Sequence, residues 1–159
     1  IERILKSRTH WAAFFTIWYN FLELIAWKYS MDLEAQIIAQ KLQKELIFLE
    51  KPDEQIQAME GIPPERIINF LKQASNWQNY TEKYSKLYLK GKLQELMSFA
   101  SIFPTRCESI IDKRDPVLFE RMLSYIERGK SLILVGITHV PGLIKLVEKE
   151  GLKILPYHR

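Results

Sequence analysis

The sequence contains very little cysteine, with Cys107 as its one thiol. An internal disulfide and a cysteine-rich metal cage are therefore excluded, and without a histidine nearby in the sequence Cys107 is expected to be a plain packed or exposed thiol. The sequence also lacks a Gly-rich phosphate loop, a serine nucleophile elbow and a His-Glu-x-x-His helix. These absences remove the usual signatures of nucleotide binding, serine hydrolysis and zincin catalysis.

The chain starts at Ile1, without methionine. Its first residues do not form a charged and apolar stretch that ends in small residues, so no signal peptide can be read from this sequence. We expect the chain to be part of a longer protein and to be incomplete at its amino terminus. Its 159 residues, 47% hydrophobic and 26% charged, predict a single globular domain over residues 1–159. The net charge of +4 is interleaved with acidic residues, which favours a solvated mixed surface over a nucleic-acid partner.

Residues 9–29 form the most apolar stretch, with aromatic and aliphatic side chains recurring every three or four positions. This spacing predicts one helix with a wide apolar stripe. A membrane span is the alternative, because the stretch approaches ~20 residues. Asn20, Glu23 and Lys28 interrupt the remaining face, so we favour a buried core helix over a membrane segment.

Two continuous apolar runs, residues 46–49 and 132–135, have the pattern of strands buried on both faces. Each is followed by a helical pattern, and a third short strand is predicted over residues 152–156. The second run leads through Gly136 into a helix that a glycine cap at Gly151 ends. The predicted fold is therefore α/β, with a small, largely parallel sheet wrapped by helices.

Residues 62–103 are helical in pattern throughout and are predicted to be a helical insertion between the sheet strands, suited to a lid or a substrate-facing wall. An aromatic stripe on this segment is expected to be core or interface rather than a ligand platform. Further helices are predicted after Met31, after Pro104 and from Asp115. The stripe consists of Trp77, Tyr80, Tyr84, Leu87 and Tyr88, and the helix after Met31 has Leu33, Ile37, Ile38 and Leu42 as its expected inner face.

Glu50 and His139 each follow one of the two main predicted strands. If the strands are parallel neighbours, both side chains reach one crevice, where they can ligate a metal or act as base and orienter. The alternatives are that Glu50 caps or pairs with the following helix and that His139 merely opens a helix. Arg114 stands at a predicted helix start, where it can hold a substrate carboxylate or form a surface ion pair with Asp112 or Asp115.

Several of these positions together resemble the TraB/GumN family, which includes the Tiki metalloproteases and is distantly related to the erythromycin esterase and ChaN-like proteins. The order and spacing of the matching motifs cover nearly the whole chain. The matching positions are Met31-Asp32, Leu49-Glu50, Glu54-Gln55, Arg114-Asp115, Gly136-Ile137-Thr138-His139 and Gly142. Lys51 replaces the family's usual threonine and Asp115 its usual asparagine.

The resemblance implies a metal-dependent peptidase or related hydrolase acting on a peptide or protein, with zinc, manganese or cobalt as the metal. It implies Glu50 and His139 as catalytic and metal-binding residues, and Arg114 and Gln55 as substrate-binding residues. The residues with an implied structural role at the site are Asp32, Glu54, Gly136 and Gly142. The alternatives are a non-catalytic module that binds a peptide, as in pheromone-shutdown proteins, and a membrane-associated structural fragment.

The family also has a Gly-x-x-His motif near its amino terminus, and this sequence has no such stretch before Trp11. A hydrolytic metal needs about three protein ligands and one open position. We therefore expect a missing amino-terminal segment of the same protein to complete the site, and this chain alone to bind metal weakly and to be inactive. Many bacterial relatives are exported, which would imply an exported or periplasmic location.

Overall fold

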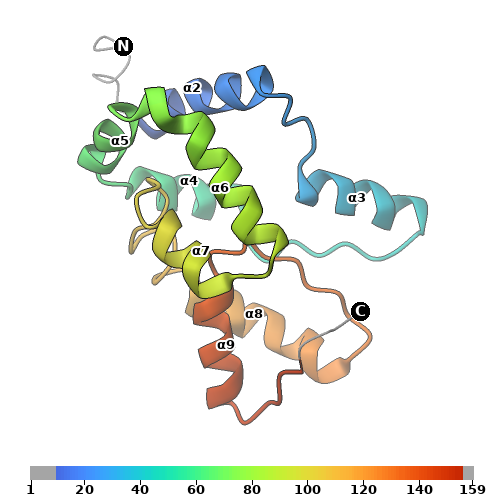
Figure 1. Ribbon diagram of the computed structural model, residues 1–159. Helices are drawn as coiled ribbons and strands as arrows, with labels where there is room; N and C mark the ends of the chain where they lie inside the picture. Colours follow the sequence, from blue (N-terminus) through green and yellow to red (C-terminus); the bar gives the residue numbers. More distant parts are fainter. Residues whose placement is uncertain (1–9, 156–159) are drawn as a thin grey trace.

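The structure, a computed structural model, describes residues 10–155, and this part of the chain consists of helices joined by turns and extended segments (Figure 1). A helix was predicted over residues 9–29, and the structure has a shorter one, α2, which ends at Leu24. The elements are α2 (His10–Leu24), α3 (Met31–Lys41), α4 (Pro52–Glu60), α5 (Pro64–Leu71), the 3-10 helix η1 (Ala74–Asn76), α6 (Trp77–Leu89), α7 (Leu93–Ala100), α8 (Asp115–Arg128) and α9 (Val140–Lys149).

Proline marks the beginning of helices in this fold. A proline occupies one of the first two positions of α4, α5, α8 and α9, where its missing N–H costs no helical hydrogen bond. The helix start predicted at Asp115 is thereby confirmed. The short helix η1 directly precedes Trp77, and Gly91 lies between α6 and α7.

The predicted sheet is wrong, because no strand forms among residues 10–155. The segments at 46–49 and 132–135 lie without a hydrogen-bonded strand neighbour in the described part of the chain. Phe48 remains 76% exposed and Leu132 85% exposed. Ile133 and Val135 contact the helices while Leu132 and Leu134 face outward, so this segment is covered on one face instead of two. An apolar β-branched run becomes a strand only when a neighbour satisfies its backbone groups.

Two other predictions fail within the described residues. The inner face expected for α3 is exposed, since this helix buries none of its residues and lies to the side of the other helices in Figure 1. The expected helix after Pro104 is a series of turns. The Arg66 guanidinium accounts for part of that change, because it binds the carbonyl oxygens of Ser101, Phe103 and Pro104 at 2.6, 3.0 and 3.2 Å. Residues 152–155 form no strand, and the remainder of that prediction lies outside the described residues.

The buried side chains form two clusters. The larger is aromatic and joins α2, α4, α5 and α6 with the turns that follow α7. Trp18 lies at its centre, with Phe70, Trp77 and Phe103 against it at ring-centroid distances of 5.2–5.4 Å and steep interplanar angles. Such edge-to-face contacts add to the stabilisation from burial alone. None of the described helices is both long and apolar enough to span a bilayer.

The smaller cluster holds α8 against α9. Its fully buried members are Leu118, Phe119 and Met122 of α8 and Leu143 of α9. Ile133 and Val135 pack on the same cluster from the extended segment that precedes α9. This cluster fixes the amino-terminal ends of α8 and α9 beside each other, and the candidate site lies there.

Helix α2 ends in a Schellman motif whose left-handed residue is Ala26. The N–H of Trp27 donates to the Leu22 carbonyl and the N–H of Ala26 to the Glu23 carbonyl, both at 3.0 Å. Ala26 has φ 62°, a conformation that costs a residue with a Cβ free energy and that glycine adopts freely. The turn directs the chain from α2 to Trp27.

We predict that Ala26→Gly raises the free energy of unfolding by about 1 kcal/mol, because glycine removes the strain of the left-handed conformation. Chemical denaturation measures the change. Gly91→Ala is the matched control, since Gly91 has φ 64° and open space where a Cβ would stand, so this substitution should lower stability by a similar amount. Equal stability of wild type and Ala26→Gly would contradict the prediction.

Candidate functional site

The centre of the candidate site is a hydrogen bond between His139 and Asp115. His139 Nδ1 and Asp115 Oδ1 are 2.6 Å apart, and both side chains are 8% exposed. Asp115 is the first residue of α8, and His139 directly precedes α9. Asp115 makes no cap hydrogen bond to its own helix, so its carboxylate serves the imidazole of the neighbouring helix instead.

Gly142 leaves the space that the Asp115 carboxylate occupies. A Cβ on Gly142 would stand 1.7 Å from Asp115 Oδ2, which no side chain can tolerate. At Gly136, by contrast, the nearest atom to an added Cβ is His139 Cδ2 at 3.6 Å. The Gly136 carbonyl accepts the N–H of His139 at 2.9 Å, which forms the turn into α9. Glycine is therefore required by contact at position 142 but not at position 136.

Glu50 is bound by Arg114 through two parallel hydrogen bonds. Arg114 Nε donates to Glu50 Oε1 at 2.7 Å, and a terminal nitrogen of the guanidinium donates to Oε2. The side chains are 11% exposed for Glu50 and 21% for Arg114. Because Arg114 and Asp115 are consecutive, the Glu50–Arg114 pair and the Asp115–His139 pair meet at the start of α8. No hydrogen bond or ion pair of the described residues joins Glu50 directly to His139.

Arg121 of α8, two turns after Arg114, forms a similar two-bond pair with Glu54. Arg121 binds both oxygens of Glu54 and also donates to the Leu49 carbonyl at 2.7 Å. Glu54 Oε2 in addition accepts the backbone N–H of Lys51 at 2.8 Å, at the start of α4. We call the pairs Glu50–Arg114 and Glu54–Arg121 the ion-pair ladder. The ladder attaches the segment before α4 to α8 by side chains, without any strand pairing.

The remaining predicted site residues lie apart from this centre or at its edge. Gln55 is exposed on α4 and makes no side-chain hydrogen bond within the described part of the chain. Asp32 is exposed in the first turn of α3, a helix that buries none of its residues. The structure therefore brings together Glu50, Arg114 and His139, with Glu54 next to them.

The donor set does not make a metal centre on its own. Residues 10–155 contain no group of three or more His, Cys, Asp or Glu side chains placed to hold an ion. Both oxygens of Glu50 bind Arg114, and His139 Nδ1 binds Asp115, which leaves His139 Nε2 without a hydrogen bond to any described residue. A catalytic zinc site needs about three protein ligands. The described residues therefore do not fit a bound divalent metal.

Sequence comparison agrees with this arrangement of motifs. The model of the TraB/PrgY/gumN family matches residues 2–156. The chain belongs to the TraB/PrgY/gumN family. No curated protein and no solved structure matches it. The predicted family is thus confirmed over almost the whole chain.

Two contacts of this TraB/PrgY/gumN protein were not predicted from its sequence. Asp115 binds His139, although the sequence indicated only a helix start there, and Arg121 was not considered at all. Helical spacing does not signal these contacts, because Glu50 lies before α4 and Arg114 before α8.

We predict that Gly142→Ala lowers the free energy of unfolding by about 1–3 kcal/mol, because the methyl group displaces the Asp115 carboxylate. The His139 ring resonances should also change, since the ring loses its partner. Urea denaturation and the NMR chemical shifts of the ring at one fixed pH measure the two effects. Gly136→Ala is the matched control and should retain both properties. A Gly142→Ala protein with unaltered ring chemical shifts would contradict the proposed contact.

We predict a loss of stability in acid that depends on Glu54. The hydrogen bonds from Arg121 and from the Lys51 backbone lower the Glu54 pKa from its ordinary 4.5 to about 2. A carboxyl with a lowered pKa stabilises the folded state above its unfolded pKa, and this stabilisation is lost as the pH falls from about 4.5 toward 2. Glu54→Gln should flatten this part of a plot of stability against pH, and salt should weaken the effect. An unchanged plot in Glu54→Gln would disprove the assignment.

Proposed function

We propose that this chain carries a hydrolytic site for peptide or protein substrates in which His139 is the reacting group. The observation that supports the proposal is the buried hydrogen bond that His139 Nδ1 donates to the Asp115 carboxylate. A carboxylate on Nδ1 selects the tautomer with the proton on that nitrogen and leaves the lone pair on Nε2. Nε2 is the ring nitrogen that binds no described residue, so it is the atom for proton transfer.

In the proposed reaction, His139 Nε2 removes a proton from water as the water oxygen attacks the substrate carbonyl. The resulting imidazolium is stabilised by the Asp115 carboxylate, and the proton then passes from Nε2 to the leaving amine. One carbon–nitrogen bond is broken, and the water supplies the hydroxyl group and the proton of the products. Asp115 is a positioning residue in this scheme, because it acts through the imidazole.

Arg114 and Gln55 remain the proposed substrate-binding residues, but they differ in how free their side chains are. The Arg114 guanidinium binds Glu50 through two of its nitrogens and the Ile110 carbonyl through the third. Its role in binding a substrate would therefore require Glu50 to release it. Gln55 is exposed, and its amide has both donors and acceptors for a peptide backbone.

A second candidate function is binding of a peptide without catalysis. The ion-pair ladder favours it, since Arg114 already neutralises Glu50 and both oxygens of that carboxylate are in use. Under this proposal the Asp115–His139 pair is a structural junction between α8 and α9. The two candidates differ in one measurable property, which is turnover.

Proteolysis of a mixture of internally quenched peptides by the wild-type chain and two variants tests the first proposal. His139→Gln should lower the rate by about 100-fold or more, because it removes the base. Asp115→Asn should lower the rate, because the imidazolium loses its carboxylate. His10→Gln is the matched control, since the His10 ring binds the Ile62 carbonyl in the other cluster.

The assay is repeated with a chelator and with added zinc, manganese or cobalt, the metals that the family resemblance implies. Activity that appears only with one of these ions would replace the metal-free scheme. Peptide binding without hydrolysis under every condition, unaffected by His139→Gln, would favour the second candidate.

A further inference from the structure

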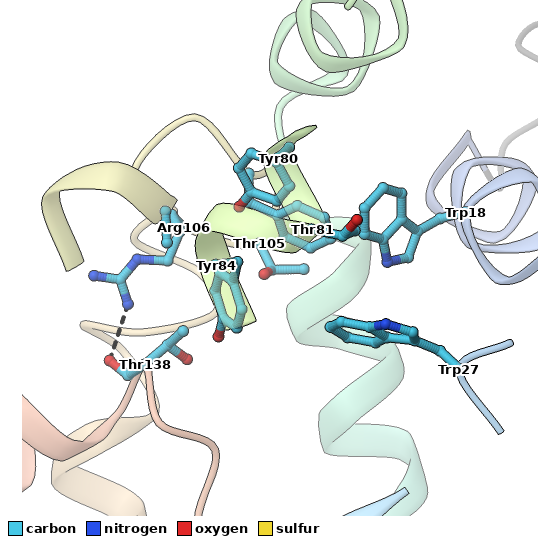
Figure 2. A pocket seen from close by; sticks show the side chains of 10 residues that line it. Trp18, Trp27, Tyr80, Thr81, Tyr84, Thr105, Arg106 and Thr138 are labelled. Atoms are coloured by element: carbon cyan, nitrogen blue, oxygen red, sulfur yellow. Dashed lines mark hydrogen bonds between the residues drawn. The ribbon is translucent and has the colours of Figure 1, made fainter. Parts of the chain in front are cut away.

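A cavity of about 230 Å³ lies between α2, α6, the turns after α7 and the loop before His139 (Figure 2). Most of its wall is aromatic. Trp18, Trp27, Tyr80, Tyr84 and Phe103 contribute to this wall, and Trp18 packs directly on Tyr80 with ring centroids 6.3 Å apart. A cavity of about 150 Å³ holds benzene, so this one has room for a ring and a short chain.

The polar side of the cavity has hydrogen-bond donors without acceptors. Arg106 is half-buried and donates to the Thr138 carbonyl at 3.0 Å, its one hydrogen bond to a described residue. It forms no ion pair with a described carboxylate, unlike Arg114 and Arg121. A cation in this environment lacks the anion that would compensate for its partial burial.

Tyr80 adds a second, independent sign of a missing partner. Its side chain lines the cavity and is 7% exposed, and its hydroxyl has no hydrogen-bond partner in the described part of the protein. Burial raises the pKa of Tyr80 and of Tyr84, so both hydroxyls stay protonated and act as donors. Figure 2 shows Arg106, Tyr80 and Tyr84 on the side of the cavity away from Trp27.

Aromatic walls by themselves fit two kinds of ligand, an apolar group or an organic cation held by cation–π contacts. The uncompensated charge of Arg106 repels a cation and attracts an anion. A carboxylate also accepts several hydrogen bonds at once, which matches the free donors of a guanidinium. The charge of Arg106 therefore excludes an organic cation and favours an apolar ligand that carries a carboxylate.

We propose that this cavity binds a small apolar carboxylate, with an aromatic or branched aliphatic body against its aromatic wall and its carboxylate on Arg106. The carboxylate belongs either to a free acid or to the carboxyl-terminal residue of a peptide. Thr138, which lines the cavity, directly precedes His139 in the sequence, and the proposal does not depend on the proposed hydrolysis. Tyr80 supplies a further donor to the ligand once the cavity is filled.

Calorimetric titration of the wild-type chain with three matched compounds tests the ligand class. They are 3-phenylpropionate, 3-phenylpropan-1-ol and 3-phenylpropylammonium, which share a body and differ in charge. The dissociation constant of the carboxylate should be lower than that of the alcohol by a factor of about 10 or more, because the carboxylate gains a charge-assisted contact. The ammonium compound should not bind. Equal binding of all three, preference for the cation, or no binding of the carboxylate would overturn the proposal.

Peptides ending in phenylalanine, with a free or an amidated terminus, distinguish the two sources of the carboxylate. Tight binding of the free terminus alone identifies a peptide end as the ligand, whereas binding of the free acid only identifies a small molecule. Both results support the site, and failure of both the acid and the peptide rejects it.

Arg106→Met tests the anchor, because it removes the guanidinium and keeps an unbranched apolar side chain. It should weaken 3-phenylpropionate binding by about 10-fold or more. Arg128→Met is the matched control, because Arg128 is exposed on α8, lies over the Tyr125 ring and should not affect binding. Tyr80→Phe should weaken binding by a smaller factor. Unchanged affinity in a folded Arg106→Met protein would overturn the assignment of the anchor.

Discussion

Two arginine–glutamate pairs at α8 are the contacts on which the arrangement of this chain depends. Arg114, directly before α8, and Arg121, within it, bind Glu50 and Glu54 with two hydrogen bonds each, and Arg121 also binds the Leu49 carbonyl. The Glu50–Arg114 pair is mostly buried, so removing one partner leaves an uncompensated charge, which costs more free energy than the pair contributes. The ladder thereby carries out the task expected of a sheet, since it joins two segments far apart in the sequence.

The same helix start links structure to chemistry. Arg114 holds the segment before α4, and the next residue, Asp115, orients His139 in front of α9. Gly142 is small because the Asp115 carboxylate fills the space beside it. Arg106 then fixes the backbone on the other side of His139 through the Thr138 carbonyl. The Gly-x-x-His turn is therefore bound by Asp115 through the His139 ring and by Arg106 through the Thr138 carbonyl.

Two kinds of site are adjacent at this turn, and they differ in how their polar groups are satisfied. In the Asp115–His139 pair, one ring nitrogen binds the Asp115 carboxylate and the other binds no described residue. In the aromatic cavity, the Arg106 guanidinium has one described acceptor and the Tyr80 hydroxyl has none, although buried donors normally have acceptors. The proposed hydrolysis rests on the first arrangement, and the proposed binding of an apolar carboxylate rests on the second.

The sequence by itself determined the family and most helices, and it singled out Glu50, Arg114 and His139 as candidate site residues. Proline at helix starts, glycine after helix ends and the order of the family motifs are local signals that need no knowledge of distant contacts. The tertiary structure decided the rest. The apolar runs at 46–49 and 132–135 found no strand neighbour in the described chain, α3 kept its apolar residues exposed, and Asp115 bound His139 instead of capping its own helix. Those outcomes depend on which distant group supplies a hydrogen bond or a covering surface, and periodicity carries no information about that partner.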